Sequence, residues 1–481
     1  MNAQVAVFGF TVSPVSYTYT IPPGLKVLVG QLVEVPFGRR LRQGIVTEVG
    51  DFTPADTILK PISRLVTLKP LLSEKQLSLA GFISSRYFAS LAESIELMLP
   101  RVPKMTPERP GQEKQELLLF PTLRQAAHAQ RKEGGLLFSH TLKPQDFDRA
   151  WQAISSGKAR RILGPRTALF APFRNLKRLC IFQTESDVYK EERRPYYRAL
   201  PVAEELTRIF GAKLEAVSYS PRVQDEFLVP HTIKILPSQE IRLTDLRHQP
   251  ILNSDLKKAL TEAAGKRILI FLNRRSEKGP LQCRTCKEVT YTADASVCPN
   301  CGGADVRFQT FNLQTLAKKI ESPANSNVTF ATQQILFEDT APFDLVAILS
   351  ADTFLHQPSY NSTEKTFQLV TSLRRLLKPR GKMIIQTGFP EEPAIKLSLA
   401  GSYRDFYLGE LKVRKDSNNP PFTKIARITS TKENEPPALP GLDVFGPFQG
   451  KKTYFVVRGQ DLSALKDLPR SWKLDIDPLS L

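Results

Sequence analysis

Four of the five cysteines lie within one short stretch, and they constrain the fold more than any other feature. They are Cys283, Cys286, Cys298 and Cys301, which form two Cys-x2-Cys pairs separated by eleven residues. Each pair turns two thiolates to one side of a tight knuckle, and two knuckles supply the four sulfurs of a tetrahedral zinc site. The Gly302–Gly303 pair provides turn residues beside the second knuckle. We therefore expect one structural Zn²⁺.

Two alternatives to a zinc site stay open at this point, namely reduced thiols without a ligand and disulfide bonds. A catalytic zinc is disfavoured, because four protein ligands leave no open position for water or substrate. The fifth cysteine, Cys180, lies in the apolar run LCIF, where we expect a buried strand. Cysteines at metal-type spacing suit a reducing compartment better than a secreted disulfide framework, so we expect a cytoplasmic protein.

The charge balance points to a polyanionic partner. The 481 residues include 67 Lys and Arg against 48 Asp and Glu, a net charge of +19. An excess of this size favours DNA or RNA, with an anionic membrane surface as a second option and a merely basic protein as a third. We expect no membrane span and no signal peptide, because no run of 18 apolar residues occurs and the N-terminus lacks a basic segment followed by an apolar one.

Hydropathy patterns divide the chain into several modules, as its length also predicts. Short strand-like runs broken by Pro and Gly fill residues 1–58 and predict a small β-barrel or β-sandwich. Apolar residues at helical spacing between Ser73 and Leu99 predict one or two helices packed on it. The stretch that follows is rich in Pro and charge, and we interpret it as a linker.

Two α/β lobes are predicted after this linker. Apolar runs such as LLLF, RRILG and LKRLCIF alternate with amphipathic segments, and the same rhythm returns after residue 235. Continuous apolar strands between helices are typical of parallel sheets covered on both faces. A final segment from Tyr403 ends in short strands and predicts a small α+β unit. The expected fold is multidomain α/β, divided as 1–104 (β domain with trailing helices), 105–116 (linker), 117–232 (first lobe), 233–400 (second lobe, with a zinc ribbon at 280–308) and 401–481 (C-terminal domain).

Six segments, in order along the chain, resemble the primosomal protein N′ (PriA) family of replication-restart DNA helicases. They are SYTYTIPPGLKVLVGQLVEVPFGRR, SHTLKPQDFDRAW, GPRTALFAPFRNL, FLNRR before the cysteines, ADTFLHQPSYNSTEKTFQLV and YRDFYLGELKVRKDSNNPPF. The resemblance implies an N-terminal domain that binds DNA 3′ ends, two RecA-like helicase lobes with a zinc-ribbon insert, and a PriA-like C-terminal domain. The family usually carries eight cysteines, so four imply one zinc ion in place of two.

The motifs that handle ATP in this family are absent from the sequence. No GxxxxGK[ST] phosphate loop occurs, and the pairs Gly157–Lys158 and Gly265–Lys266 look like ordinary helix ends. The acidic DEEH motif is replaced by residues 183–186 (QTES), which removes the carboxylate that would hold Mg²⁺. The SAT-like motif reads SYS at 218–220, and the motif that offers arginine fingers reads SLRRLL at 372–377. The family's winged-helix domain has no counterpart either. We expect helicase ancestry without ATP hydrolysis, and therefore not an enzyme.

The 3′-end pocket of the family maps by position onto Tyr17, Thr18, Gly38 and Lys60. The resemblance implies that Tyr17 stacks on the terminal base, Gly38 lets the backbone approach the sugar, and Lys60 meets a phosphate. Thr18 departs from the usual Asp, which puts selectivity for a terminal hydroxyl in doubt. Tyr17 as a packed barrel residue and Lys60 as a solvated loop lysine are the structural alternatives.

Arginines recur in pairs and add further candidates for DNA contact. Arg39, Arg40 and Arg42 form a basic hairpin tip beside Gly38. The other pairs are 160–161, 193–194, 274–275 and 374–375. Any one pair is more often a solvated face than a contact, but with this net charge we expect some subset to follow a phosphate backbone.

Three functions follow from these observations, and we prefer the first. It is a PriA-like DNA-binding protein of replication restart that binds forked or 3′-ended DNA without ATP-driven unwinding. The second is an active 3′–5′ helicase with a cryptic ATP site, and the third is a zinc-ribbon scaffold for protein partners. The expected partner is branched or 3′-ended DNA. Single-strand-binding protein and other replication proteins are further candidates, and no small-molecule substrate is expected.

Overall fold

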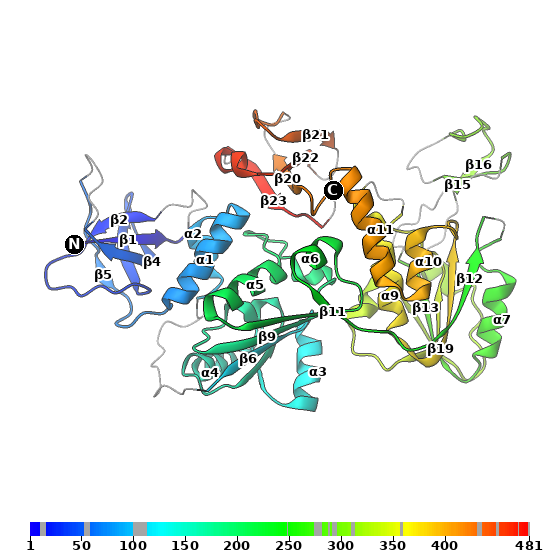
Figure 1. The fold of residues 1–481 in the computed structure, drawn as a ribbon, viewed down its shortest axis with the longest axis horizontal. Coiled ribbons are helices and arrows are strands. Elements are labelled where there is room, and N and C mark those ends of the chain that lie inside the picture. Colours follow the sequence, from blue (N-terminus) through cyan, green and yellow to red (C-terminus); the bar gives the residue numbers. More distant parts are fainter. Residues whose placement is uncertain are drawn as a thin grey trace. The chain divides into compact units, whose positions relative to one another are not determined.

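The computed structural model describes residues 1–9, 16–51, 58–99, 113–247, 249–273, 281–286, 289–290, 296–308, 313–355, 359–430, 435–448, 452–469 and 471–479. Within these ranges the chain forms five sheets and packs into two compact units (Figure 1). The first unit holds 1–218, 227–232 and 418–481, and the second holds 219–226 and 233–417. The mixed α/β class with parallel sheets is as predicted.

A five-stranded antiparallel sheet opens the first unit, in the order β2-β1-β4-β3-β5. Its strands are β1 (Asn2–Val7), β2 (Tyr17–Thr20), β3 (Leu32–Phe37), β4 (Arg40–Gly50) and β5 (Arg64–Leu65). The edge strand β2 also bonds to the segment before β5, because the Thr20 amide donates to the Lys60 carbonyl and the Ile62 amide donates to Thr20, both at 3.0 Å. Valines that alternate along β1 and β3 fill the interior of this sheet.

Two short helices follow, α1 (Glu74–Tyr87) and α2 (Leu91–Glu96), as the helical spacing predicted. Each begins with a capping box, in which Ser73 and Ser90 accept the backbone N–H three residues on. Their apolar faces share one core with the next sheet rather than packing on the N-terminal sheet alone. The helices therefore join the N-terminal sheet to the first lobe.

The first lobe is a six-stranded sheet in the order β11-β10-β9-β6-β8-β7. Its strands are β6 (Gln115–Leu119), β7 (Leu136–Leu137), β8 (Arg161–Gly164), β9 (Leu176–Phe182), β10 (Lys213–Ser218) and β11 (His231–Ile233). The pairs from β10 to β7 are parallel. Helices α4 (Pro144–Ser155) and α5 (Ala199–Phe210) cover one face and α3 (Leu123–Glu133) the other. Cys180 is buried in β9, as expected.

The second unit contains a parallel sheet in the order β12-β19-β18-β13-β17. Its strands are β12 (Glu240–Asp245), β13 (Arg267–Phe271), β17 (Asn327–Ala331), β18 (Phe343–Ile348) and β19 (Leu377–Thr387). Its helices are α7 (Ser254–Glu262), α8 (Leu313–Ala317), α9 (Ser362–Arg374), α10 (Pro393–Ala400) and α11 (Tyr403–Asp416), together with residues 223–226 of α6 (Val223–Leu228). Separate apolar clusters form on the two faces, so this sheet is also covered on both sides.

A four-stranded antiparallel sheet ends the chain and returns to the first unit. Its strands are β20 (Lys424–Ser430), β21 (Asp443–Phe448), β22 (Tyr454–Gly459) and β23 (Trp472–Ile476). The buried Lys190 of the first lobe donates to the Ile476 carbonyl and lies 2.8 Å from the Asp475 carboxylate. The division into five segments stays a prediction. The predicted C-terminal domain begins at residue 401, whereas α11 packs in the second unit and the chain leaves that unit only after Ser417.

No helix in the part of the chain that the structure describes is long and apolar enough to cross a membrane.

Candidate nucleic-acid interface and metal centre

Three of the four residues mapped to a 3′-end pocket lie together at one end of the N-terminal sheet. The Tyr17 ring meets Phe37 edge to face, with ring centroids 4.9 Å apart. Phe37 precedes Gly38, and the exposed Lys60 ammonium donates to the Gly38 carbonyl at 3.4 Å. An aromatic ring, a bare backbone segment and an ammonium group are thus neighbours. A ring that can stack on a base and a cation that can meet a phosphate are the parts a nucleotide end needs.

The turn between β3 and β4 explains why a glycine stands at position 38. Phe37 pairs with Arg40, so Gly38 and Arg39 form a two-residue hairpin turn. Gly38 has φ +60°, a conformation that favours glycine in such turns. A Cβ there would meet no atom within 4 Å, so the surface above Gly38 is open. Arg39 and Arg40 are both exposed at this tip.

Thr18 is placed differently from its neighbour Tyr17. Successive side chains alternate across a strand, so Thr18 faces the side opposite to Tyr17. There the Gln4 amide donates to the Thr18 hydroxyl at 3.0 Å, and Gln4 is its partner in the register of β1 and β2. Thr20 lies two residues further along β2, and its backbone N–H and C=O form hydrogen bonds with the segment around Lys60. Backbone groups two residues apart in a strand point to the same edge, so those of Thr18 point to this edge as well. Thr18 therefore adjoins the cluster through its backbone rather than its hydroxyl.

Sequence reasoning missed two members of this region, Phe37 and Gln4. Phe37 packs on Tyr17, and its place beside Gly38 in an alternating strand was the signal that could have found it. Gln4 is found only once the β1–β2 register is known, and the sequence does not provide that register.

Most of the other arginine pairs serve the fold. Arg160 and Arg161 pair with Glu113 and Glu116, Arg194 pairs with Glu93, and Arg374 is buried against the carbonyls of Ser398 and Leu399. Arg375 lies 5.9 Å from the centre of the Tyr219 ring. The pair at 274–275 lies outside the described residues.

The four predicted cysteine ligands converge. Their sulfurs all lie within 4.8 Å of one another, and Cys283–Cys301 and Cys286–Cys298 are 3.6 Å apart. A tetrahedron with Zn–S bonds of about 2.3 Å has sulfurs about 3.8 Å apart, so the donor set fits one zinc ion. The Cys286 amide donates to the Cys283 sulfur, which lowers the pKa of that thiol to about 6. The thiolate that a metal requires is thereby favoured.

The second knuckle is closed by backbone hydrogen bonds. The Gly302 amide donates to the Cys298 carbonyl and the Cys298 amide donates to Gly303, both at 2.8 Å. Gly302 has φ +70°, as expected for a turn glycine. Three short strands, β14 (Leu281–Cys283), β15 (Val289–Thr290) and β16 (Val306–Phe308), form a small sheet beside the cysteines.

The carboxyl edge of the six-stranded sheet is the place where ligands of parallel α/β sheets usually bind. Here β9 ends at Phe182, and residues 183–186 follow it directly. The Ser218 hydroxyl donates to the Glu185 carboxylate, and Tyr189, buried, directs its hydroxyl to the carbonyls of Leu119 and Phe182. Thr184 is buried in the same place. Side chains of this chain thus bridge the ends of β6, β9 and β10.

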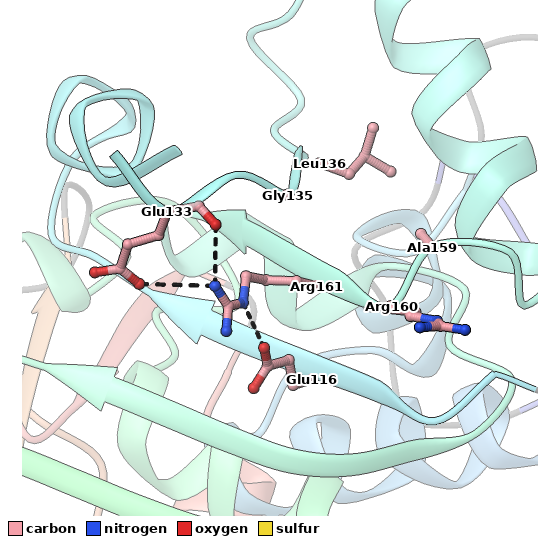
Figure 2. A pocket seen from close by; sticks show the side chains of 7 residues that line it. All are labelled: Glu116, Glu133, Gly135, Leu136, Ala159, Arg160 and Arg161. Carbon is pink, nitrogen blue, oxygen red and sulfur yellow. Dashed lines mark hydrogen bonds and ion pairs between the residues drawn. The ribbon is translucent and has the colours of Figure 1, made fainter. Parts of the chain in front are cut away.

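A surface pocket of about 520 Å³ lies at the opposite edge, at the amino ends of β6, β7 and β8 (Figure 2). Figure 2 shows Arg161 between Glu116 and Glu133. The Arg161 guanidinium donates to the Glu116 carboxylate at 2.5 Å and to the Glu133 carbonyl at 3.1 Å. These contacts already compensate its charge, so this pocket offers little to a phosphate.

Comparison with known proteins finds similarity both in the N-terminal domain and along the rest of the chain. Residues 6–100 match the model of the PriA 3′DNA-binding domain. The replication restart protein PriA of Bacillus subtilis is 26% identical over 59% of this chain and 45% of its own length. The PriA protein of Thermotoga maritima is 25% identical over 59% of this chain and 48% of its own. That of Rickettsia felis is 22% identical over 87% of this chain and 85% of its own.

The chain is thus similar to the PriA family, through its N-terminal domain and through these relatives. It spans about half of the length of the Bacillus and Thermotoga relatives. Solved structures that resemble this chain include the helicase Lhr of Mycobacterium smegmatis bound to single-stranded DNA and AMP-PNP. It has 13% identity and a TM-score of 0.33 over 60% of this chain and 42% of that one. Dbp5 of S. cerevisiae bound to RNA and ADP BeF3 has 11% identity and the same TM-score over 72% and 97%. At these scores the likeness carries no argument.

Proposed function

We propose that this chain is a DNA-binding protein of replication restart that holds forked or 3′-ended DNA without unwinding it at the expense of ATP. The observation that carries the proposal is the cluster of Tyr17, Phe37, Gly38 and Lys60 in the segment that matches the 3′DNA-binding domain. Stacking of a terminal base on Tyr17 would contribute roughly 1–3 kcal/mol and would tolerate any base. Lys60, Arg39 and Arg40 would add contacts to the phosphates and make binding sensitive to salt.

Loss of ATP chemistry is the second part of the proposal. The sequence has no phosphate loop, and Glu185, in the place of the family's acidic motif, accepts a hydrogen bond from Ser218. A nucleoside triphosphate needs backbone N–H groups, a lysine and a metal-binding carboxylate arranged together. The bridged edge of the six-stranded sheet supports the view that these two α/β lobes, which we take to be RecA-like, act as a frame.

The four cysteines complete the proposal with one structural Zn²⁺ in a ribbon near residues 280–308. Zinc would stabilise this small sheet, because metal binding and folding are coupled in such sites. Thiolates that must stay reduced to hold zinc are consistent with the cytoplasm. A zinc content of one ion per chain, lost in Cys298→Ser, is the expected result of metal analysis.

The decisive experiment compares labelled forks that carry a free or a blocked 3′ end, titrated with the protein at several salt concentrations. We expect salt-sensitive binding that favours the free end, a roughly tenfold or larger loss in Tyr17→Ala, and a small effect in Tyr17→Phe. Phosphate release from ATP is measured alongside with and without DNA. Absence of fork binding at micromolar protein contradicts the DNA-binding part, and DNA-stimulated phosphate release contradicts the second part and favours an active helicase.

A further inference from the structure

The four clustered cysteines differ in their exposure to solvent. Cys283 and Cys298 are 1% and 2% exposed, whereas Cys286 and Cys301 reach the surface. Each Cys-x2-Cys pair therefore has one buried and one accessible sulfur. A soluble oxidant meets the accessible sulfurs first, because oxidation of cysteine follows thiolate character and exposure. The two buried sulfurs are protected from direct attack.

Each accessible sulfur has a buried sulfur of the other pair close to it. The Cys286 and Cys298 sulfurs are 3.6 Å apart, and so are the Cys283 and Cys301 sulfurs. The sulfurs of a disulfide are about 2.05 Å apart, so each contact becomes a disulfide through a movement of about 1.5 Å. Oxidation of an accessible thiol can therefore be followed at once by a bond to the other pair.

Bonds between the two pairs are favoured over bonds within each pair. All four sulfurs lie within 4.8 Å of one another, but both contacts at 3.6 Å join one pair to the other. Within the first pair the Cys286 amide donates to the Cys283 sulfur at 3.5 Å, and this hydrogen bond holds the turn. Gly302 and Gly303 hold the second turn through backbone hydrogen bonds with Cys298. Bonds between the pairs leave both turns in place.

We propose that the four cysteines form a peroxide-sensitive switch that exchanges the zinc ion for two disulfides, Cys286–Cys298 and Cys283–Cys301. This inference rests on the single zinc ion proposed above. In each half, the accessible thiolate attacks one oxygen of hydrogen peroxide and becomes a sulfenic acid, and hydroxide leaves. The buried thiolate then attacks the sulfenic sulfur, so that the disulfide forms and a second hydroxide leaves. Two peroxide molecules thus take four electrons from four thiolates, and no thiolate is left to bind the metal.

The oxidised site keeps the fold of the small sheet beside it, which includes β15 and β16 (Figure 1). The two disulfides are nested, because residues 286–298 lie inside residues 283–301, and each one closes a loop of the chain. Four thiolates around one Zn²⁺ carry two surplus negative charges, whereas two disulfides are neutral. Oxidation therefore makes this surface more cationic while the fold stays the same, and a partner can recognise such a change.

Mass spectrometry of the full chain after treatment with hydrogen peroxide identifies the bonds. Trypsin separates Cys283, Cys286 and the remaining two ligands onto three peptides, which are GPLQCR, TCK and EVTYTADASVCPNCGGADVR. We expect these three peptides to be joined by two disulfides, with TCK attached to Cys298 and GPLQCR attached to Cys301. Zinc release, followed with a chromogenic chelator, should consume two peroxide molecules per ion. Dithiothreitol and added zinc should reverse both changes.

Variants separate the two bonds from each other and from the rest of the chain. Cys286→Ser should still form the bond between residues 283 and 301, and Cys283→Ser the bond between residues 286 and 298. Cys180→Ser is the matched control, because Cys180 is buried in β9, and it should leave zinc release and both bonds unchanged. Hydrogen exchange in β14 and β16 should stay slow in the oxidised protein and become about tenfold faster in reduced protein stripped of metal by a chelator.

Several results would overturn the proposal. TCK joined to GPLQCR, with an internal bond in the third peptide, would mean that the bonds form within each pair. Zinc that stays bound in excess peroxide, or that leaves without any disulfide, would rule out the exchange. Fast hydrogen exchange in the oxidised protein would show that the small sheet opens. Absence of zinc from the freshly purified, reduced protein is a separate outcome, because it contradicts the metal site itself and the peptide map still reports whether the disulfides form.

Discussion

The arginines of the N-terminal hairpin and those inside the second unit put the same side chain to opposite uses. Arg414 is 1% exposed and lies between the carboxylates of Glu364 and Glu410, at 2.6 and 2.9 Å. Arg39 and Arg40 are exposed at a turn, and no acidic partner for them occurs among the residues that the structure describes. The net charge therefore overstates how many cationic side chains are available to DNA, because some of them are paired with carboxylates inside the fold.

The largest effect is expected from Arg414→Met, which should lower the free energy of unfolding by about 3–5 kcal/mol. Glu364 and Glu410 would stay buried without a cation. Burial already raises the pKa of Glu410, so protonation at acid pH should relieve the defect and the loss should be larger at neutral pH. Urea unfolding at both pH values measures it. Arg404→Met, on the exposed side of the same helix, is the control, and equal stability of the two variants would refute the comparison.

Arg374 and Arg375 test the same contrast in adjacent residues. Arg374→Met should cost about 2 kcal/mol, because the Ser398 and Leu399 carbonyls near the end of α10 lose their donor. Arg375→Met removes a contact with the Tyr219 ring and should cost less than about 1 kcal/mol. Thermal unfolding of both variants gives the difference. A larger loss for Arg375 would mean that burial does not distinguish these arginines.

The hairpin should respond in DNA binding and not in stability. Arg39→Ala/Arg40→Ala is expected to weaken fork binding about tenfold and to reduce the slope of log affinity against log salt by up to about 2. Anisotropy titrations over a range of salt concentrations measure both quantities. An unchanged slope would show that these two side chains do not contact phosphate.

The smallest effects are expected at Arg160 and Arg161. The ion pair of Arg160 with Glu113 is exposed and that of Arg161 with Glu116 is partly exposed, so Arg160→Ala/Arg161→Ala should change the free energy of unfolding by about 1 kcal/mol or less. Fork affinity and its salt slope should stay at the values of the unaltered chain. A slope as low as that of the hairpin variant would place this pair on the DNA path as well.

Features that depend on local sequence patterns were predicted better than features that depend on contacts between residues far apart in the chain. The two parallel sheets and the convergence of four cysteines follow from apolar runs and from spacing, which act over a few residues. The partners of Arg414 did not follow, because Glu364 is 50 residues away and only the packing of α9 against α11 brings the two together. The placement of α11 in the second unit and the hydrogen bond between Gln4 and Thr18 also depend on contacts between distant residues, so they were not predicted either.

The first unit takes residues from both ends of the chain, and the second unit is inserted between them. During synthesis the ribosome therefore delivers the whole of the inserted unit before the outer one can be finished. Until the last strand emerges, Lys190 lacks the Asp475 carboxylate and the Ile476 carbonyl that accompany it in the mature fold. A nascent chain therefore carries an incomplete first lobe until residues 475 and 476 have been added.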